Sequence, residues 1–319
     1  MKKSLKSLWF IFVSILIAIC IRVFLFEIYL IPSQSMENTI MPGDIVIVSK
    51  WIYGPRMPHL FGKKFHYKRL GKLKKLKRFD IVVFNFPCGD TIFMHYPEEN
   101  YYMVKNKERY KTLKDPTLYL PVNKRQPYIK RCIGLPGDTI EVKEWQPYIN
   151  GVKIVVPVPI NLRKNGYIGK NDIESRRYPR NASHPKFWQD AMSFRIIFPN
   201  NFIYRWNHDI FGPVVIPQKG QRIKLDLVNI WLYKRVIETY EHNILEINKD
   251  GIFINGNRVT TYTFSMNYYF MMGDNRPNSK DSMFWGFVPE DHIIGKTSLI
   301  LFSKGEDGIR RNRFFRFFK

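Results

Sequence analysis

Two serines separated by one residue, Ser33 and Ser35, lie in the stretch IPSQSM (31–36), directly after an apolar N-terminal segment. Proline and serine are ordinary turn residues after a hydrophobic element, so the stretch is also consistent with a simple turn. A serine hydroxyl can attack a carbonyl group when a neighbouring base removes its proton. The second interpretation is therefore a nucleophile beside a membrane.

A lysine is the candidate base for Ser35. The GxSxG motif is absent, and none of the seven histidines lies in a setting that favours a Ser-His triad. A buried lysine amine can be neutral near physiological pH, because apolar surroundings lower its pKa. Lys130 in PYIKRCIGLPGD has Ile129 and Ile133 nearby, and this alternation predicts an inward-facing strand position. Lysines in strands are more often exposed, so the residue pattern alone leaves the role of Lys130 open.

The apolar N-terminal segment predicts a membrane anchor. Residues 8–21 contain one weakly polar residue, Ser14, and three lysines precede them. A transmembrane helix needs about 20 residues, so the span must tolerate Arg22, whose long side chain can extend to the headgroups. A cleavable signal peptide is the alternative, but only bulky residues follow, without a small-x-small cleavage site. We expect an uncleaved anchor over 8–29, with the basic residues 1–7 in the cytoplasm and residues 30–319 on the far side.

The composition predicts a mainly β protein with a substantial core. The 319 residues are 45% hydrophobic and 16% aromatic, and short Val- and Ile-rich runs alternate with turn residues. The segments YINGVKI (148–154) and FINGNRV (253–259) each place Asn-Gly between apolar residues, which predicts two similar hairpins. The region of about 155–250 suggests no chemistry, and we interpret it as an inserted region.

The net charge of +24 is compatible with three kinds of surface. A nucleic-acid partner, an anionic membrane surface and a solvated lysine-rich surface would each produce such a balance. The basic residues are densest at 63–78 and 309–319. The three cysteines form no CxxC pair and the histidines lack metal-ligand spacing, so we expect no metal and no cofactor.

Four blocks, in order, resemble type I signal peptidases, the bacterial membrane-anchored serine peptidases that remove signal peptides from exported proteins. They are IPSQSM after the apolar segment, FDIVVF, YIKRCIGLPGD and MMGDNRPNSKDSMFWGFVP, within about 30–50, 76–87, 128–142 and 268–298. The resemblance implies a catalytic domain of coiled antiparallel β-sheets behind a transmembrane helix, with an apolar surface in the bilayer. It also implies a periplasmic site on the bacterial cytoplasmic (inner) membrane, membrane lipid as a partner, and signal peptides with small residues at −1 and −3 as substrates.

The resemblance implies a role for each matching residue. Ser35 corresponds to the nucleophile, Lys130 to the general base, and Ser33 to the serine that joins the Ser35 backbone N–H in the oxyanion hole. Ser279 corresponds to the serine that orients the lysine amine. The supporting residues implied in the same way are Asp281, Arg131, Asp274 and Arg276, and the substrate-binding residues are Ile31, Pro32, Met36, Tyr128 and Ile129.

Three positions depart from the family pattern. Asn38 stands where the family usually has proline, and Phe79 where it often has glycine. Met283 replaces an arginine that would pair with Asp281, and Arg131 or Arg276 could take over that pairing. None of these changes removes a catalytic group, so we expect an active enzyme.

Two other functions remain open from the sequence. A membrane-tethered nucleic-acid-binding protein would explain the charge and the run at 63–78, although no RRM, KH or helix-turn-helix signature is present and we expect no specific nucleic-acid partner. An inactive peptidase-like scaffold would explain Met283.

Overall fold

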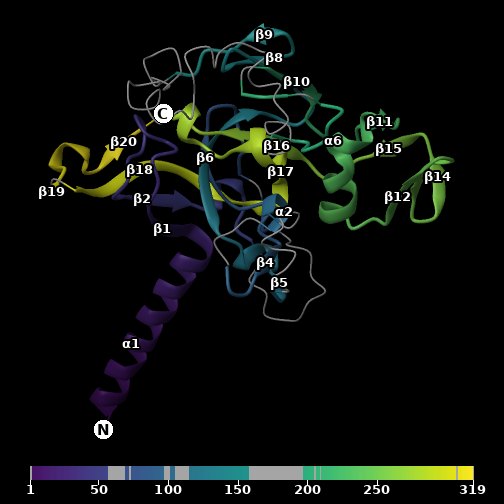
Figure 1. Cartoon of the computed structure of the whole chain (residues 1–319). Coiled ribbons are helices and arrows are strands. Elements are labelled where there is room, and N and C mark those ends of the chain that lie inside the picture. The colour runs from purple at the N-terminus through teal and green to yellow at the C-terminus, as the bar shows by residue number, and fades with distance from the viewer. Residues whose placement is uncertain are drawn as a thin grey trace.

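The N-terminal helix extends away from the remainder of the molecule (Figure 1). In this computed structural model the described residues are 2–56, 69–71, 73–96, 101–104, 115–157, 197–204, 206–208, 210–306 and 308–318. Helix α1 (Lys2–Cys20) continues into the π-helical turn η1 (Ile21–Leu25). The 20 residues Lys6–Leu25 are long and apolar enough to cross a membrane.

The helical segment ends at Leu25, before the end of the expected anchor at 29. Strand β1 (Phe26–Leu30) pairs with β2 (Asp44–Ser49), so residues 26–29 of the expected 8–29 anchor lie in the sheet. The apolar character of FEIYL suits a half-covered strand as well as a membrane helix, and the backbone hydrogen bonds to β2 decide between them.

Within the described residues, the largest sheet has nine antiparallel strands. Their order is β1-β2-β18-β3-β6-β16-β17, and β19 and β20 both pair with β18. The register of the long strand β18 shifts against β2 and β3, as bulges do when they bend a strand. The mainly β fold with a curled antiparallel sheet is therefore confirmed. The bounds not yet given are β18 (Ile293–Gly305), β3 (Ile81–Asn85), β6 (Pro127–Gly134), β16 (Tyr268–Met272), β17 (Val288–Pro289), β19 (Gly308–Ile309) and β20 (Arg316–Phe317).

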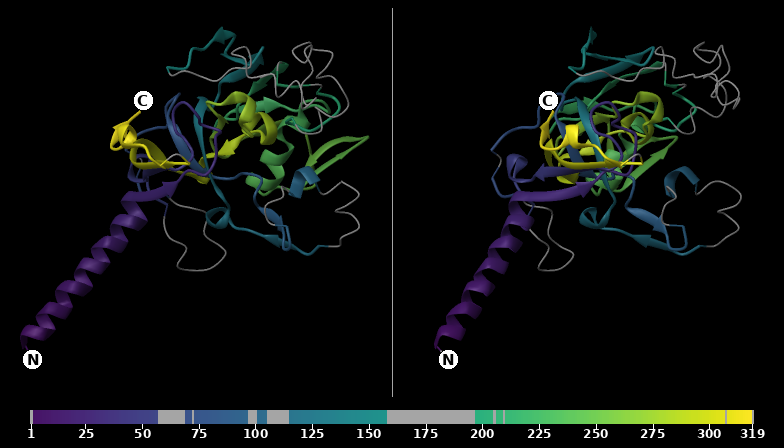
Figure 2. Two further views of the ribbon diagram at one scale, coloured as in Figure 1. Left: turned by 60° about the vertical axis from the view of Figure 1, so that its left-hand side comes forward. Right: turned by 90° about the vertical axis from the view of Figure 1, so that its left-hand side faces the viewer.

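Smaller sheets and short helices surround the large sheet (Figure 2). One sheet has the order β10-β7-β8-β9, and the others are β11-β15, β12-β13-β14 and β4-β5. The strands are β4 (Thr91–Phe93), β5 (Thr117–Tyr119), β7 (Thr139–Lys143), β8 (Gln146–Ile149), β9 (Val152–Lys153), β10 (Ile210–Val215), β11 (Arg222–Lys224), β12 (Leu245–Asn248), β13 (Gly251–Ile254), β14 (Asn257–Val259) and β15 (Thr261–Thr263). The helices and helical turns are η2 (Trp51–Tyr53), α2 (Tyr101–Val104), η3 (Val122–Lys124), α6 (Ile230–Arg235), η5 (Val236–Tyr240), η6 (Arg276–Asn278), α7 (Ser282–Trp285), η7 (Glu290–His292) and η8 (Arg311–Arg313).

Both predicted Asn-Gly hairpins are present. Strand β8 pairs with β9 across Asn150-Gly151, and β13 pairs with β14 across Asn255-Gly256. All four turn residues have positive φ, between 51° and 79°. Two consecutive left-handed residues are what a tight hairpin turn requires, and Asn-Gly adopts them at little cost.

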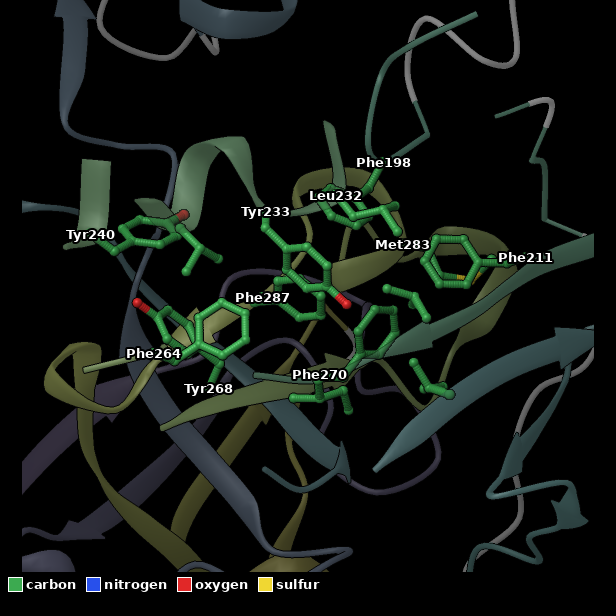
Figure 3. Packing of buried hydrophobic residues seen from close by; sticks show 14 of the residues in the cluster. Phe198, Phe211, Leu232, Tyr233, Tyr240, Phe264, Tyr268, Phe270, Met283 and Phe287 are labelled. Carbon is green, nitrogen blue, oxygen red and sulfur yellow. The ribbon is translucent and has the colours of Figure 1, made fainter. Parts of the chain in front are cut away.

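The region 155–250 is only partly described, because residues 158–196 lie outside the described residues. Its strand β10 pairs with β7, and α6 contributes Leu232 and Tyr233 to the large apolar core (Figure 3). Met283, at the position where the family has arginine, is buried in the same core. The described part of this region therefore shares one core with two of the blocks that resemble the family, 128–142 and 268–298.

The C-terminal segment is folded onto the sheet. Strand β20 pairs with β18, and Arg313 is buried with its guanidinium against Asp44 at 2.6 Å. Asp44 therefore supplies a buried partner for one basic side chain of 309–319, a segment in which the sequence is densely basic. Of the expected basic run 63–78, residues 63–68 and 72 lie outside the described residues.

Candidate active site

The serine and the lysine of the sequence prediction lie in contact. Ser35 is in the loop between β1 and β2, and Lys130 is on β6, and both side chains are buried. Lys130 Nζ donates a hydrogen bond to Ser35 Oγ at 2.6 Å and another to the Ile129 carbonyl at 3.0 Å. The predicted alternation of β6 is wrong, because every residue from Ile129 to Gly134 is buried. Both faces of this part of the strand are covered by packed elements.

Burial lowers the pKa of Lys130 to about 8. The Asp281 and Asp274 carboxylates oppose this shift, but the loss of hydration around the ammonium is the larger effect. A fraction of the amine is therefore neutral near neutral pH and can accept the proton of a hydroxyl.

A second hydroxyl lies beside the first. Ser33 Oγ is 3.4 Å from Ser35 Oγ, and the Ser33 side chain is exposed. The loop therefore presents one hydroxyl to the solvent next to the hydroxyl that contacts the lysine.

The end of strand β16 holds the serine loop in place. The Asn275 backbone N–H donates to the Ser35 carbonyl at 3.1 Å, and Asn275 Nδ2 donates to the Gln34 carbonyl at 3.2 Å. A Cβ at Gly273 would lie 2.5 Å from the Ser35 carbonyl oxygen and 2.3 Å from Ser279 Oγ. Only glycine allows these segments to approach so closely.

The hydroxyl of Ser279 contacts a carboxylate in this structure. Ser279 Oγ donates to Asp281 Oδ2 at 3.0 Å, whereas the two hydrogen bonds of the Lys130 amine go to Ser35 and Ile129. The Asp281 carboxylate also accepts from the Gly273 and Met283 backbone N–H groups, both at 3.1 Å. Burial raises the pKa of Asp281, while these hydrogen bonds and the charge of Arg276 act in the opposite direction.

Arg131 pairs with Asp274. Its Nε and Nη2 lie 2.8 and 2.7 Å from the two Asp274 carboxylate oxygens, and Arg131 is fully buried. Thr39 Oγ1 donates to the same carboxylate at 2.6 Å. Such a bidentate pair is geometrically specific, so Arg131 is committed to Asp274.

Arg276 is the arginine whose charge acts on the Asp281 carboxylate, although no ion pair joins the two side chains. Its charge lowers the pKa of Asp281, and burial lowers the pKa of Arg276 itself. Its Nη1 lies 3.4 Å from Met272 Sδ, and among the described residues its Nε and Nη2 have no hydrogen-bond partner. Within the described part of the chain, neither arginine therefore makes an ion pair with Asp281.

The predicted substrate-binding residues divide into two groups. Ile31, Met36 and Ile129 are buried together in one apolar cluster, whereas Pro32 is exposed and Tyr128 is half-buried. Ile31 and Met36 belong to the same loop as Ser35, and Ile129 precedes Lys130 on β6.

Strand β6 offers a free backbone edge beside the lysine. Its residues 127–131 pair with β3, whereas β16 pairs only from Arg131 onward. Among the described residues, 127–130 therefore pair with a strand on one side only.

One residue that the sequence prediction did not place in the site contacts it, namely Thr39. It lies inside a block that resembles the family, and that location was the available signal. Its partner, Asp274, is far from it in sequence.

A buried lysine amine in contact with a loop serine, on a curled antiparallel sheet, defines a serine endopeptidase of the Ser/Lys type. The family described as signal peptidase, peptidase S26, matches residues 4–201 and 215–302. The chain belongs to this family.

Two relatives agree with this assignment. Signal peptidase I from Buchnera aphidicola subsp. Acyrthosiphon pisum is 30% identical over 325 residues, covering 98% of this chain and 80% of the relative. Signal peptidase I from Aquifex aeolicus is 26% identical over 305 residues, covering 95% and 85%. A crystal structure of a signal peptidase I from Enterococcus faecalis aligns with 70% of this chain and 97% of its own, at 21% identity and a TM-score of 0.26.

Proposed function

We propose that Ser35 is the nucleophile and Lys130 the general base in the removal of signal peptides from exported proteins. The observation that carries this proposal is the 2.6 Å contact between the buried Lys130 amine and the Ser35 hydroxyl. The depressed pKa of Lys130 supplies the neutral amine that a base requires.

The reaction proceeds in two halves. Neutral Lys130 takes the Ser35 proton while Oγ attacks the scissile carbonyl carbon, and the ammonium then donates a proton to the leaving amine. A water molecule, deprotonated by Lys130, hydrolyses the resulting ester and releases the signal peptide. The Ser35 backbone N–H and the Ser33 hydroxyl stabilise the oxyanion in both halves.

The polar groups behind the dyad orient it. The Arg131–Asp274 pair and Thr39 fix the wall to which the serine loop is attached. Asp281, which accepts a hydrogen bond from Ser279, supplies negative charge that favours the ammonium form of Lys130. Arg276 moderates the charge of Asp281 in place of the missing arginine.

Substrate binding uses the free edge of β6. An extended peptide pairs with residues 127–130, which brings its scissile bond to Ser35. Ile31, Met36 and Ile129, neighbours of Ser35 and Lys130 in the chain, are buried in one apolar cluster, and this packed surface favours small side chains at −1 and −3 of the signal peptide.

The anchor sets the location of the reaction. The N-terminus lies in the cytoplasm, α1 and η1 cross the bacterial cytoplasmic membrane, and the domain from β1 onward lies at its outer face. Preproteins emerging there present their cleavage sites at the membrane surface.

Preprotein cleavage by the full chain in detergent tests the proposal. We expect cleavage by the wild type and by Ser265→Ala, an exposed serine on the far side of the core, and none by Ser35→Ala. Wild-type protein without cleavage would favour the inactive scaffold. Tight, salt-sensitive nucleic-acid binding in place of cleavage would favour the nucleic-acid-binding alternative.

A further inference from the structure

A polar cavity of about 570 Å³ lies between the end of the apolar helix and the adjacent end of the curled sheet. Its walls come from η1, the start of β1, the residue after β2, Arg56, the end of β3, η3 with the two residues that follow it, the start of β6 and the start of β18. Figure 2 shows that the helix joins the domain at β1. The cavity therefore occupies the junction between the membrane segment and the catalytic domain.

The lining of this cavity is strongly basic. Its charged residues are Arg22, Lys50, Arg56, Lys124, Arg125 and one acid, Glu27. Glu27 pairs with Lys50 at 2.8 Å, so the lining holds five cations and one carboxylate. A cavity walled in this way attracts anions.

Several of the cations are held in place by the fold. Arg56 Nη2 donates to Asn85 at 2.7 Å, Arg125 Nη1 contacts His292 at 2.9 Å, and Lys50 Nζ donates to the Arg22 carbonyl at 3.0 Å. Arg22 and Lys124 have exposed side chains on the two sides of the cavity. The basic lining is thus a structured part of the junction.

The position of the cavity along the helix identifies the kind of anion. The apolar span has 20 residues, which at about 1.5 Å per residue matches a hydrocarbon core of about 30 Å. Arg22 lies in the last turn of this span, so the cavity lies at the depth of the lipid headgroups. Phosphate groups of lipids are the anions concentrated at that depth.

We propose that this cavity binds the phosphate-bearing headgroup of an anionic phospholipid. The site is separate from the Ser35–Lys130 pair, because Lys130 lies three residues along β6 from Pro127 at the cavity, which is about 10 Å at 3.3 Å per residue. A bound headgroup would bridge the helix and the sheet and fix the domain against the membrane surface. The proposal requires that the helix spans the membrane, and it does not depend on the catalytic assignment.

Native mass spectrometry of the full chain in detergent tests the site. The protein is mixed with equal amounts of phosphatidylglycerol and phosphatidylcholine, and the retained lipids are counted. We expect the wild type to retain phosphatidylglycerol preferentially. Arg22→Gln with Lys124→Gln should lower this preference by about fivefold for each charge removed.

A matched control separates the cavity from the general positive charge. Lys153→Gln with Lys249→Gln removes the same charge from exposed residues on β9 and beside the β12–β13 turn, and it should leave the preference unchanged. Equal retention of the two lipids by the wild type, or equal losses in the two double variants, would overturn the proposal. If inorganic phosphate displaced the retained phosphatidylglycerol completely, the site would be one for soluble anions and the lipid assignment would be wrong.

Discussion

The protonation state of Lys130 depends on the hydrogen-bond and ion-pair partners of the neighbouring carboxylates. Asp274 is paired with Arg131, and Asp281 accepts hydrogen bonds from two backbone N–H groups and from Ser279. These donors stabilise the two carboxylates, so the carboxylates depend less on Lys130 as a partner. Desolvation of the Lys130 ammonium is consequently the larger effect, and the pKa falls to about 8.

This environment predicts how cleavage depends on pH. Only neutral Lys130 can take the proton, so kcat/KM should fall about tenfold per pH unit below pH 8 and level off above it. Lys130→Arg should be nearly inactive, because a guanidinium stays protonated at any working pH. The matched control is Lys280→Arg, an exposed position next to Ser279. Substantial activity of Lys130→Arg would show that another residue is the base.

Ser33 should contribute to the rate without being essential. Removing one oxyanion donor typically costs about 100- to 1,000-fold in rate, so Ser33→Ala should be slow but measurable in single-turnover cleavage. Its pH midpoint should stay near that of the wild type, because the Lys130 amine makes no hydrogen bond to Ser33 in this structure. A rate equal to that of the wild type would remove Ser33 from the oxyanion hole.

Motifs predicted which residues meet, but not all of their partners. The short blocks placed Ser35 and Lys130 correctly side by side, because each block has a distinctive local pattern. The choice of Asp274 as the partner of Arg131 depends on side chains brought together from segments far apart in sequence, whereas Ser279 contacts Asp281, only two residues away. The burial of Met283 in the large core likewise depends on α6 and β10, which the sequence did not place.

At the scale of elements, two departures from the family pattern fall at unusual backbone positions. Phe79 and Asn38 have φ of 73° and 79°. Left-handed φ costs an ordinary residue roughly 1–2 kcal/mol, which explains why glycine is frequent at the Phe79 position. Phe79 remains there because its ring packs on the large core and its carbonyl accepts from Arg131. Proline cannot adopt the φ of Asn38, so the loop after Ser35 has its own local conformation.

The C-terminal segment fixes the far end of the same loop. Arg313 Nη2 donates to Asp44 at 2.6 Å and to the Thr39 carbonyl at 3.1 Å. Thr39 in turn contacts Asp274, so the tail is connected through the loop to the wall of the site. Sequence periodicity could not reveal this, because a short basic and aromatic tail has the same pattern whether it is docked or free.

Arg313→Gln should therefore destabilise the domain. It leaves Asp44 buried without its main partner, and losses of about 3–5 kcal/mol are typical when one member of a buried pair is removed. Arg310, 3.8 Å from Asp44, compensates in part, so we expect a loss near the lower end of that range. Thermal unfolding in detergent measures the effect, with the exposed Arg316→Gln as the control. Equal stabilities of the two variants would show that the Arg313–Asp44 pair does not hold the tail.

At the scale of the whole molecule, the charge distribution is strongly asymmetric around the span. Lys2, Lys3 and Lys6 precede the apolar core, whereas residues 23–49 contain no lysine or arginine. The remaining basic residues lie in a long folded domain, and charges in long domains have little influence on orientation. The short flanks should therefore decide the topology and leave the N-terminus in the cytoplasm.

Labelling with a membrane-impermeant maleimide in intact spheroplasts tests this orientation. The native cysteines give a low background, because Cys88 and Cys132 are buried and Cys20 lies in the apolar helix. Lys249→Cys, at an exposed position beside the β12–β13 turn, should react in intact spheroplasts, whereas Lys3→Cys should react only after lysis. The reverse pattern would place the serine and lysine on the cytoplasmic side, where preproteins have not yet crossed the membrane. In that case the topology and the function argued from it would both fail, even though the geometry of the Ser35–Lys130 pair would be unchanged.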